Sequence, residues 1–116
     1  MDIERRQCLR FFTPLKLELE KESNEVMPGQ IRNFSRGGLR ACFDSFDFAP
    51  ATCVNLKIQR PNKDDFSLAS AEVVWKKAIE GKWEVGMKLK EFSNWVKTEI
   101  LELGFKEWCK SHKLPV

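Results

Sequence analysis

Three arginines lie close together near the start of the chain: Arg5, Arg6 and Arg10. A guanidinium group is a planar fork of donors that binds phosphate oxygens in pairs. The same fork binds the O6 and N7 edge of guanine or stacks on a base. An arginine cluster at a chain end can therefore wrap around a small guanine nucleotide. Taken alone, the R-x-x-x-R spacing is more often a solvated basic terminus.

A second polar segment carries an amide, a hydroxyl, a guanidinium and two glycines in a row: Asn33, Ser35, Arg36, Gly37 and Gly38. The amide of Asn33 offers a donor and an acceptor to the edge of a base, and Ser35 adds a hydroxyl. The glycines permit positive φ and let a ligand approach the backbone closely. Taken alone, this segment is more often an ordinary turn with a Gly-Gly corner.

Other chemistry finds no support in the sequence. The only histidine, His112, lies in a lysine-rich tail and has no partner to orient it for nucleophilic catalysis. Adjacent carboxylates such as Asp64 and Asp65 fall in polar turns, and no phosphate-binding glycine motif is present. The four cysteines form no C-x-x-C pair. We therefore expect no enzyme activity, no catalytic residues, no metal site and no cofactor.

Composition limits the class of protein further. The chain has 116 residues, 42% apolar and 32% charged, which fits one globular domain. A net charge of +3 is too balanced for sequence-independent DNA binding, so no DNA partner is expected. The N-terminus has no apolar leader and no run is long enough to cross a bilayer. These features predict a cytoplasmic protein without membrane insertion.

The elements that must position the two polar segments are short strands, because apolar residues alternate with polar ones. Trp75 and Trp83 fall on the apolar side of this alternation and are expected to be buried. Glu80-Gly81 indicates a hairpin turn, and Pro28-Gly29 indicates a break in the second strand. The pattern predicts an antiparallel barrel or sandwich. The six expected strands are Leu15–Glu20, Val26–Ile31, Leu39–Phe43, Val54–Gln59, Ala69–Trp75 and Trp83–Leu89.

A helix is expected to follow the last strand. The apolar spacing changes after Phe92 to that of a helix, with Val96 and Ile100 on one face, and Ser93 is its predicted N-cap. The helix is expected to close one end of the barrel. Its apolar face is wide enough to suit a homodimer contact as well, although core packing is the favoured interpretation.

Together, the two polar segments change the interpretation. R-x-x-x-R before the first strand, then [D/N]-x-S-x-x-G between the second and third, resembles the PilZ domain signature. Three later segments, 38–41, 71–75 and 85–89, are similar to strands of that family. The resemblance implies a single PilZ domain over residues 1–116. It would be all-β with a C-terminal helix: an arginine-rich switch segment 1–13, a six-stranded antiparallel β-barrel 14–92 and a helix 93–111.

The resemblance also implies a ligand, cyclic di-GMP, and no chemistry. The matched residues are Arg6, Arg10, Asn33, Ser35 and Gly38. The two arginines would contact the phosphates and a guanine, Asn33 and Ser35 would hold a guanine edge, and Gly38 would leave room for the ligand. Further contacts are expected from Arg5, Arg36 and Gly37. Arg5 lies outside the minimal motif and suggests a stacked pair of ligand molecules.

The hypothesis that follows is a sensor switch. Ligand charge would neutralise the arginines and fold their segment onto the barrel, which would change the surface seen by an unidentified protein partner. One alternative is a PilZ-like protein–protein adaptor that binds no nucleotide. Another is a small barrel that binds single-stranded nucleic acid, which requires exposed aromatics among basic residues.

Overall fold

The computed structural model describes residues 11–12, 15–21, 23–61 and 63–111. Arg5, Arg6 and Arg10 therefore lie outside the described residues. The elements in chain order are β1 (Phe11–Phe12), β2 (Lys16–Glu20), β3 (Val26–Phe34), β4 (Gly38–Phe43), β5 (Cys53–Gln59), β6 (Phe66–Ile79), β7 (Lys82–Phe92) and α1 (Asn94–Ser111).

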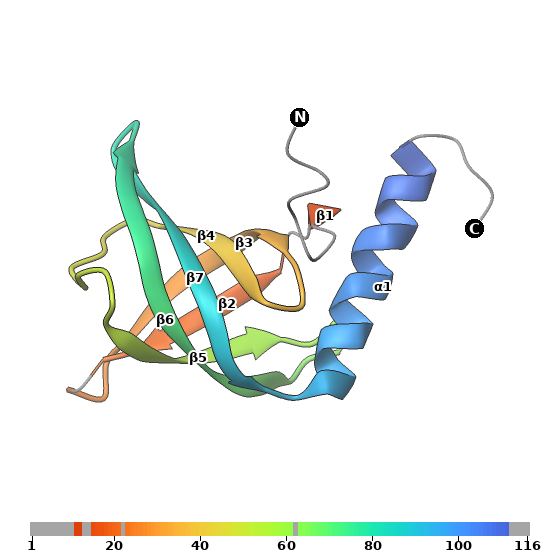
Figure 1. The fold of residues 1–116 in the computed structure, drawn as a ribbon, viewed down its shortest axis with the longest axis horizontal. Coiled ribbons are helices and arrows are strands. Elements are labelled where there is room, and N and C mark those ends of the chain that lie inside the picture. The colour runs from red at the N-terminus through yellow and green to blue at the C-terminus, as the bar shows by residue number, and fades with distance from the viewer. Residues whose placement is uncertain (1–10, 13–14, 22, 62, 112–116) are drawn as a thin grey trace.

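Six strands form a closed barrel (Figure 1). The order β3-β2-β5-β6-β7-β4 is closed by pairing of β4 with β3, and every pairing is antiparallel. The short β1 adds to β3 outside this ring. The all-β fold with a C-terminal helix, predicted as a six-stranded antiparallel barrel, is thus confirmed. Closure leaves few free strand edges, which is how barrels avoid edge-to-edge association.

Alternating residues of each strand fill the barrel. Leu17 and Leu19 on β2 are almost fully buried, as are Leu56 and Ile58 on the neighbouring β5. Burying a side chain of this size stabilises the fold by about 1.5–3 kcal/mol. The polar residues between them face outward. The alternation of apolar and polar residues in the sequence therefore corresponds to side chains inside and outside the barrel.

The β6–β7 hairpin has the predicted two-residue turn. Glu80 has φ 50° and Gly81 has φ 81°, the left-handed conformations of the turn type that best matches strand twist. Figure 1 shows this hairpin rising beyond the other strands.

Trp75 corrects one expectation. The register between β6 and β7 shifts between Val73 and Trp75, which is a bulge. Trp75 therefore lies on the outer face, with 37% of its surface exposed. Trp83, in contrast, is partly buried against the core. Simple alternation carries no signal for an extra residue, so the prediction that Trp75 is buried was wrong.

Strand β3 corrects another. It was expected to be broken at Pro28-Gly29, but it runs without interruption to Phe34. Pairing with β4 begins only at Gly29, so the missing N–H of Pro28 leaves no hydrogen bond to β4 unmade. Asn33, the first residue of the second predicted segment, therefore lies within strand β3.

Helix α1 begins as predicted. The backbone N–H of Val96 donates to Ser93 Oγ at 3.3 Å, the N-cap bond that satisfies one free donor of the first turn. Val96 and Ile100 are buried in the same core as the strands, and Figure 1 shows the helix across one end of the barrel. The helix thus packs on the core, as expected. The homodimer contact stays a prediction.

Candidate functional site

The turn between β3 and β4 contains the predicted polar motif. The Ser35 backbone N–H donates to the Gly38 carbonyl at 2.9 Å, and Ser35 Oγ donates to the same oxygen at 3.2 Å. Ser35 is only 3% exposed. Its hydroxyl hydrogen therefore closes the turn, and only its lone pairs remain to accept a bond from a ligand. The predicted ligand contact of Ser35 stays a prediction.

Gly38 is required for a different reason from the one expected, and Gly37 has no such requirement. Neither has positive φ; among the described glycines only Gly81 does. A Cβ on Gly38 would lie 2.5 Å from the Met87 carbonyl oxygen, whereas one on Gly37 would meet nothing within 4 Å. The Gly37 carbonyl accepts a bond from the Leu89 N–H at 2.9 Å. Gly38 thus lets the turn lie tightly against β7.

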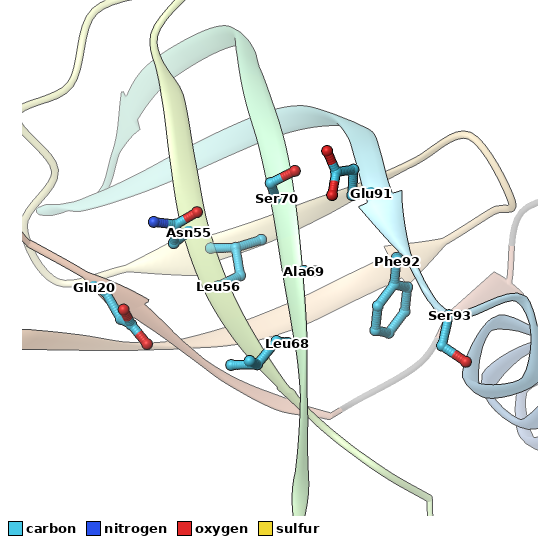
Figure 2. A pocket seen from close by; sticks show the side chains of 9 residues that line it. All are labelled: Glu20, Asn55, Leu56, Leu68, Ala69, Ser70, Glu91, Phe92 and Ser93. Atoms are coloured by element: carbon cyan, nitrogen blue, oxygen red, sulfur yellow. The ribbon is translucent and has the colours of Figure 1, made fainter.

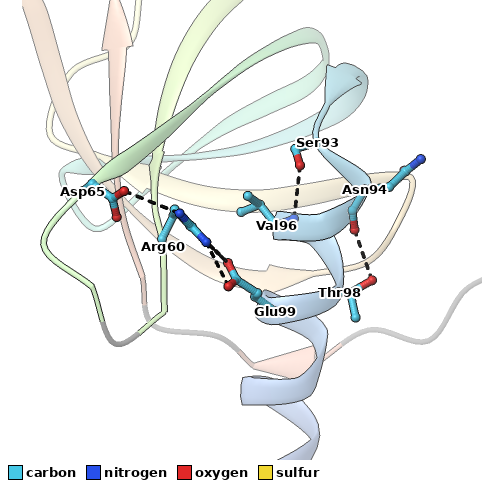
Figure 3. Close-up of polar contacts among 7 residues, drawn as sticks. All are labelled: Arg60, Asp65, Ser93, Asn94, Val96, Thr98 and Glu99. Carbon is cyan, nitrogen blue, oxygen red and sulfur yellow. Dashed lines mark hydrogen bonds and ion pairs between the residues drawn. The ribbon is translucent and has the colours of Figure 1, made fainter.

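Arg36 connects the turn to the helix. Its Nη2 donates to Thr98 Oγ1 at 3.2 Å, and Thr98 in turn donates to the Asn94 carbonyl at 3.1 Å (Figure 3). Arg36 is otherwise exposed. A guanidinium on a surface hydroxyl exchanges partners easily, so Arg36 is free to turn towards an anion that arrives at the motif.

Strand β1, which follows the arginine half of the motif in the sequence, pairs with β3 beside the other half. Phe11 lies opposite Phe34 and Phe12 lies opposite Asn33. Phe11 directly follows Arg10 in the sequence. The side chain of Asn33 is half-buried at this junction.

A row of outward residues continues from Asn33 across the sheet. Asn33 lies opposite Arg40, Arg40 opposite Gly86, and Gly86 opposite Trp75. The indole of Trp75 lies directly over Gly86. The Nε of Arg40 is 3.1 Å from Glu84 Oε1 in an ion pair, although the N–H is not aimed well enough at the oxygen to make a hydrogen bond. A planar anion on this face would therefore meet a guanidinium and an indole.

Sequence analysis did not identify Arg40 or Trp75 as candidates. Arg40 had a usable signal, because it lies on the polar side of an alternating strand just after the motif. Trp75 had none, because the bulge that turns it outward is not visible in the pattern.

Metal and membrane features are absent from the residues that the structure describes. No three His, Cys, Asp or Glu side chains gather there in a way that could hold an ion. The one helix of that part of the chain is not apolar enough over its length to cross a bilayer.

A family comparison agrees with the geometry of the turn and of β1. The protein-family model described as PilZ domain matches residues 4–105. The chain belongs to the PilZ family. The match includes the arginine segment, the β3–β4 turn and most of α1. No curated protein matches the chain.

Solved structures share this fold. The PilZ domain of YcgR from Escherichia coli, solved with c-di-GMP, has a TM-score of 0.72 at 12% identity; 94% of this chain and 98% of that one align. The Bacillus subtilis inhibitor of motility (MotI/DgrA) has a TM-score of 0.77 at 18% identity, with 93% and 53% aligned. MrkH from K. pneumonia has a TM-score of 0.73 at 10% identity, with 90% and 50% aligned. The chain thus spans all of an isolated PilZ domain and about half of the longer proteins.

An ion-pair network fixes α1 to the PilZ barrel. Arg60, just after β5, donates through Nε and Nη2 to Glu99 at 3.0–3.1 Å, and its Nη1 lies 3.5 Å from Asp65 (Figure 3). The hydrogen bond with Glu99 raises the pKa of Arg60 above its ordinary value, and burial opposes it. The bond from Arg60 likewise holds the pKa of Glu99 low, again against burial. Bidentate pairs of this kind hold orientation well.

Glu99→Gln is expected to lower the melting temperature by a few degrees at pH 7. Because the pKa of Glu99 is depressed below its ordinary value of 4.5 in the folded chain, its stabilisation is present above that pH and is lost as the pH falls through the folded-state pKa. Thermal unfolding at pH 7 and at pH 3 measures this. Glu102→Gln, at an exposed position of the same helix, is the matched control. An equal loss at both pH values would show that the charge of Glu99 is not what anchors the helix.

A shallow depression of about 520 Å³ lies elsewhere on the PilZ barrel (Figure 2). Glu20, Asn55, Ser70 and Glu91 form a continuous cross-strand row along it. None of the predicted motif residues is among its lining, so it is separate from the candidate site. The full lining is Glu20, Asn55, Leu56, Leu68, Ala69, Ser70, Glu91, Phe92 and Ser93.

Proposed function

We propose that this PilZ domain is a cyclic di-GMP receptor without enzymatic activity. The observation that carries the proposal is the pairing of β1 with β3, because β1 begins one residue after Arg10 in the sequence and lies opposite Phe34 and Asn33. PilZ membership and the likeness to YcgR, solved with c-di-GMP, support it. The cytoplasm is the proposed setting.

The groups around the turn suit a ligand with two phosphates and two guanines. We expect Arg6 and Arg10 to bind phosphate and one guanine edge, since a guanidinium fork matches both. Asn33 supplies a donor and an acceptor for a base, and the lone pairs of Ser35 accept from a base N–H. Arg40 lies next to Asn33 in the outward row, where its guanidinium is paired with Glu84.

The proposed response is a change in the N-terminal segment and its surroundings. Ligand phosphates neutralise the arginines, which lets residues 1–10 fold against the barrel at the point where β1 already pairs. Arg36 offers a second route, because it bonds Thr98 on α1. If Arg36 turns to the ligand, the helix loses a contact. A protein partner would then recognise the altered surface.

A calorimetric titration with cyclic di-GMP tests the proposal, with GMP and GTP as controls. Saturable binding at micromolar or tighter, about −8 kcal/mol, supports the receptor function. Two ligand molecules per chain in the wild type, falling to one in Arg5→Ala, would support the role proposed for Arg5 in stacking a ligand pair. No binding by calorimetry and by a second probe would leave the adaptor alternative, a PilZ fold that acts through protein contacts alone.

Ser35→Ala separates the two roles of the hydroxyl. The backbone N–H of Ser35 still bonds the Gly38 carbonyl, so stability should fall by only about 1 kcal/mol. Ligand affinity should fall by about tenfold, since one acceptor for the base is lost. Urea unfolding and calorimetry measure the two effects. Ser70→Ala, on the outer face of β6, is the control. Unchanged affinity in Ser35→Ala would make the serine a turn residue only.

One observation favours the alternative that the barrel binds single-stranded nucleic acid, although this remains the weaker proposal. Trp75 is exposed, and Lys77 lies 5.9 Å from its ring centroid. Binding of a single strand needs several such rings along a basic groove. Trp83, the other strand tryptophan, is partly buried instead. A pull-down with single-stranded RNA that weakens steeply with salt would favour this alternative.

A further inference from the structure

The last six residues of β6 form an open edge of the barrel. Strand β5 pairs with β6 only as far as Glu72. On that side Val73 makes the final backbone bonds: its N–H donates to the Thr52 carbonyl, and its carbonyl accepts from the Ala51 N–H. Within the described part of the chain, residues 74–79 have β7 as their only neighbouring strand.

The two-residue turn Glu80-Gly81 determines which backbone groups of this edge point outward. The residues that flank such a turn form a hydrogen-bonded pair, here Ile79 and its partner on β7, and bonded and non-bonded pairs alternate along the ladder. Lys77 therefore bonds β7. The N–H and C=O groups of Lys76 and Ala78 point away from the barrel, ready to bond an added strand.

The side chains along the edge combine apolar surface with positive charge. Val74, Trp75 and Ile79 are 52%, 37% and 38% exposed. Between the last two lie Lys76 and Lys77. The edge thus has apolar side chains at both ends and two lysines in the middle. Exposed apolar side chains gathered in one place are typical of a binding surface.

Charge argues against a second copy of this chain on the edge. Two antiparallel copies centred on this edge would place Lys77 opposite Lys77 or Lys76 opposite Lys76, and like charges directly opposite each other destabilise a strand pair. Glu84, opposite Lys77 on β7, is paired with Arg40, and Asp44, just after β4, is paired with Lys82. The ammonium of Lys76 lies 5.1 Å from the Trp83 ring centroid and that of Lys77 lies 5.9 Å from the Trp75 ring centroid. These ring contacts leave the ammonium donors able to bond carboxylates from another molecule.

We propose that residues 74–79 of β6 dock an extended acidic segment of a partner protein, which adds to the sheet as an antiparallel strand. Backbone bonds from Lys76 and Ala78 would give affinity, as in other cases of strand addition. Specificity would come from two adjacent carboxylates opposite the lysines, flanked by apolar residues opposite Trp75 and Ile79.

This docking surface would be the place where the protein partner of the proposed function binds. The inference rests on the proposed function only in assuming that such a partner exists. The surface's hairpin end, which precedes Lys82, lies at the far end of β7 from the motif turn, where Gly38 pairs with Lys88, whereas Trp75, opposite Gly86, also borders the row that begins at Asn33. At about 3.4 Å per residue, the two ends are about 20 Å apart. Docking is therefore measured without nucleotide, and its failure would leave the ligand proposal standing.

The test uses the full chain and two synthetic peptides, TVTEEVT and its basic counterpart TVTKKVT. Amide chemical shifts and hydrogen exchange are followed by NMR during titration. We expect the acidic peptide to protect the amides of Lys76 and Ala78 and to bind at least about tenfold more tightly than the basic one. No protection by the acidic peptide, or equal protection by both, would overturn the proposal. So would protection of the same amides by self-association in the absence of peptide.

Two variants make the result specific to this edge. Ala78→Pro removes an outward N–H that β7 does not use, so the fold is retained and protection of Lys76 is lost. The double variant Lys76→Glu with Lys77→Glu should reverse the preference and select the basic peptide. Unchanged binding in Ala78→Pro, or an unchanged preference in the double variant, would place the peptide elsewhere on the barrel.

Discussion

Gly38→Ala is expected to lower the free energy of unfolding by about 3 kcal/mol, or the melting temperature by about 10 °C. A Cβ at this position would lie 2.5 Å from the carbonyl oxygen of Met87. That oxygen belongs to the backbone of β7 and cannot move without disturbing the pairing of β4 with β7. Urea unfolding measures the loss.

Gly37→Ala is the matched control for this change. A Cβ there meets nothing within 4 Å, and the residue has no positive φ. We expect a change within about 0.5 kcal/mol, as for other surface substitutions. Equal stability of the two alanine variants would mean that β4 and β7 lie further apart than described. Because Gly38→Ala disturbs the turn, a loss of ligand binding in that variant alone would not make Gly38 a ligand contact.

Arg10→Ala is expected to weaken cyclic di-GMP binding by about tenfold to a hundredfold, while folding is little changed. A hydrogen bond that involves a charged group contributes about 1.5–3 kcal/mol, which corresponds to that range. Arg10 directly precedes Phe11, whose backbone pairs with Phe34 in the motif turn region. Calorimetry measures the affinity, and circular dichroism checks the fold.

Arg10→Lys separates charge from shape. Lysine keeps the positive charge but has no planar fork, so we expect affinity between that of the wild type and that of Arg10→Ala. Added salt should weaken binding by the wild type, because several contacts are to phosphate. If Arg10→Ala binds as tightly as the wild type, the assignment of the arginine segment to the ligand is wrong.

The sequence predicts the parts of this fold that depend on neighbouring residues. Alternation places Leu17 and Leu19 inside the barrel because successive residues of a strand face opposite sides. The hydroxyl of Ser93 caps α1 because it lies three residues before the N–H that it binds. Glu80-Gly81 forms the hairpin turn because glycine accepts the positive φ that this turn requires.

What the sequence does not predict depends on contacts between distant residues or on an irregularity. Gly38 faces Met87, which lies on another strand, so its role in close packing has no local signal. Arg60 and Glu99 are 39 positions apart, and nothing near either one indicates the pair. Trp75 is exposed because of a single bulge. The same limit holds for the site: the motif residues are recognisable in sequence, but the pairing of β1 with β3 beside Asn33 is not.

The order of synthesis on the ribosome has a consequence for the motif turn. Strand β7 pairs with both β4 and β6, and the amide of Leu89 bonds the Gly37 carbonyl. The nascent chain cannot close the barrel until this last strand has left the exit tunnel. The turn emerges early but stays unsupported while about fifty further residues are translated, at 5–20 residues per second. During those seconds the growing polypeptide contains the arginines and Asn33 but not the finished motif turn.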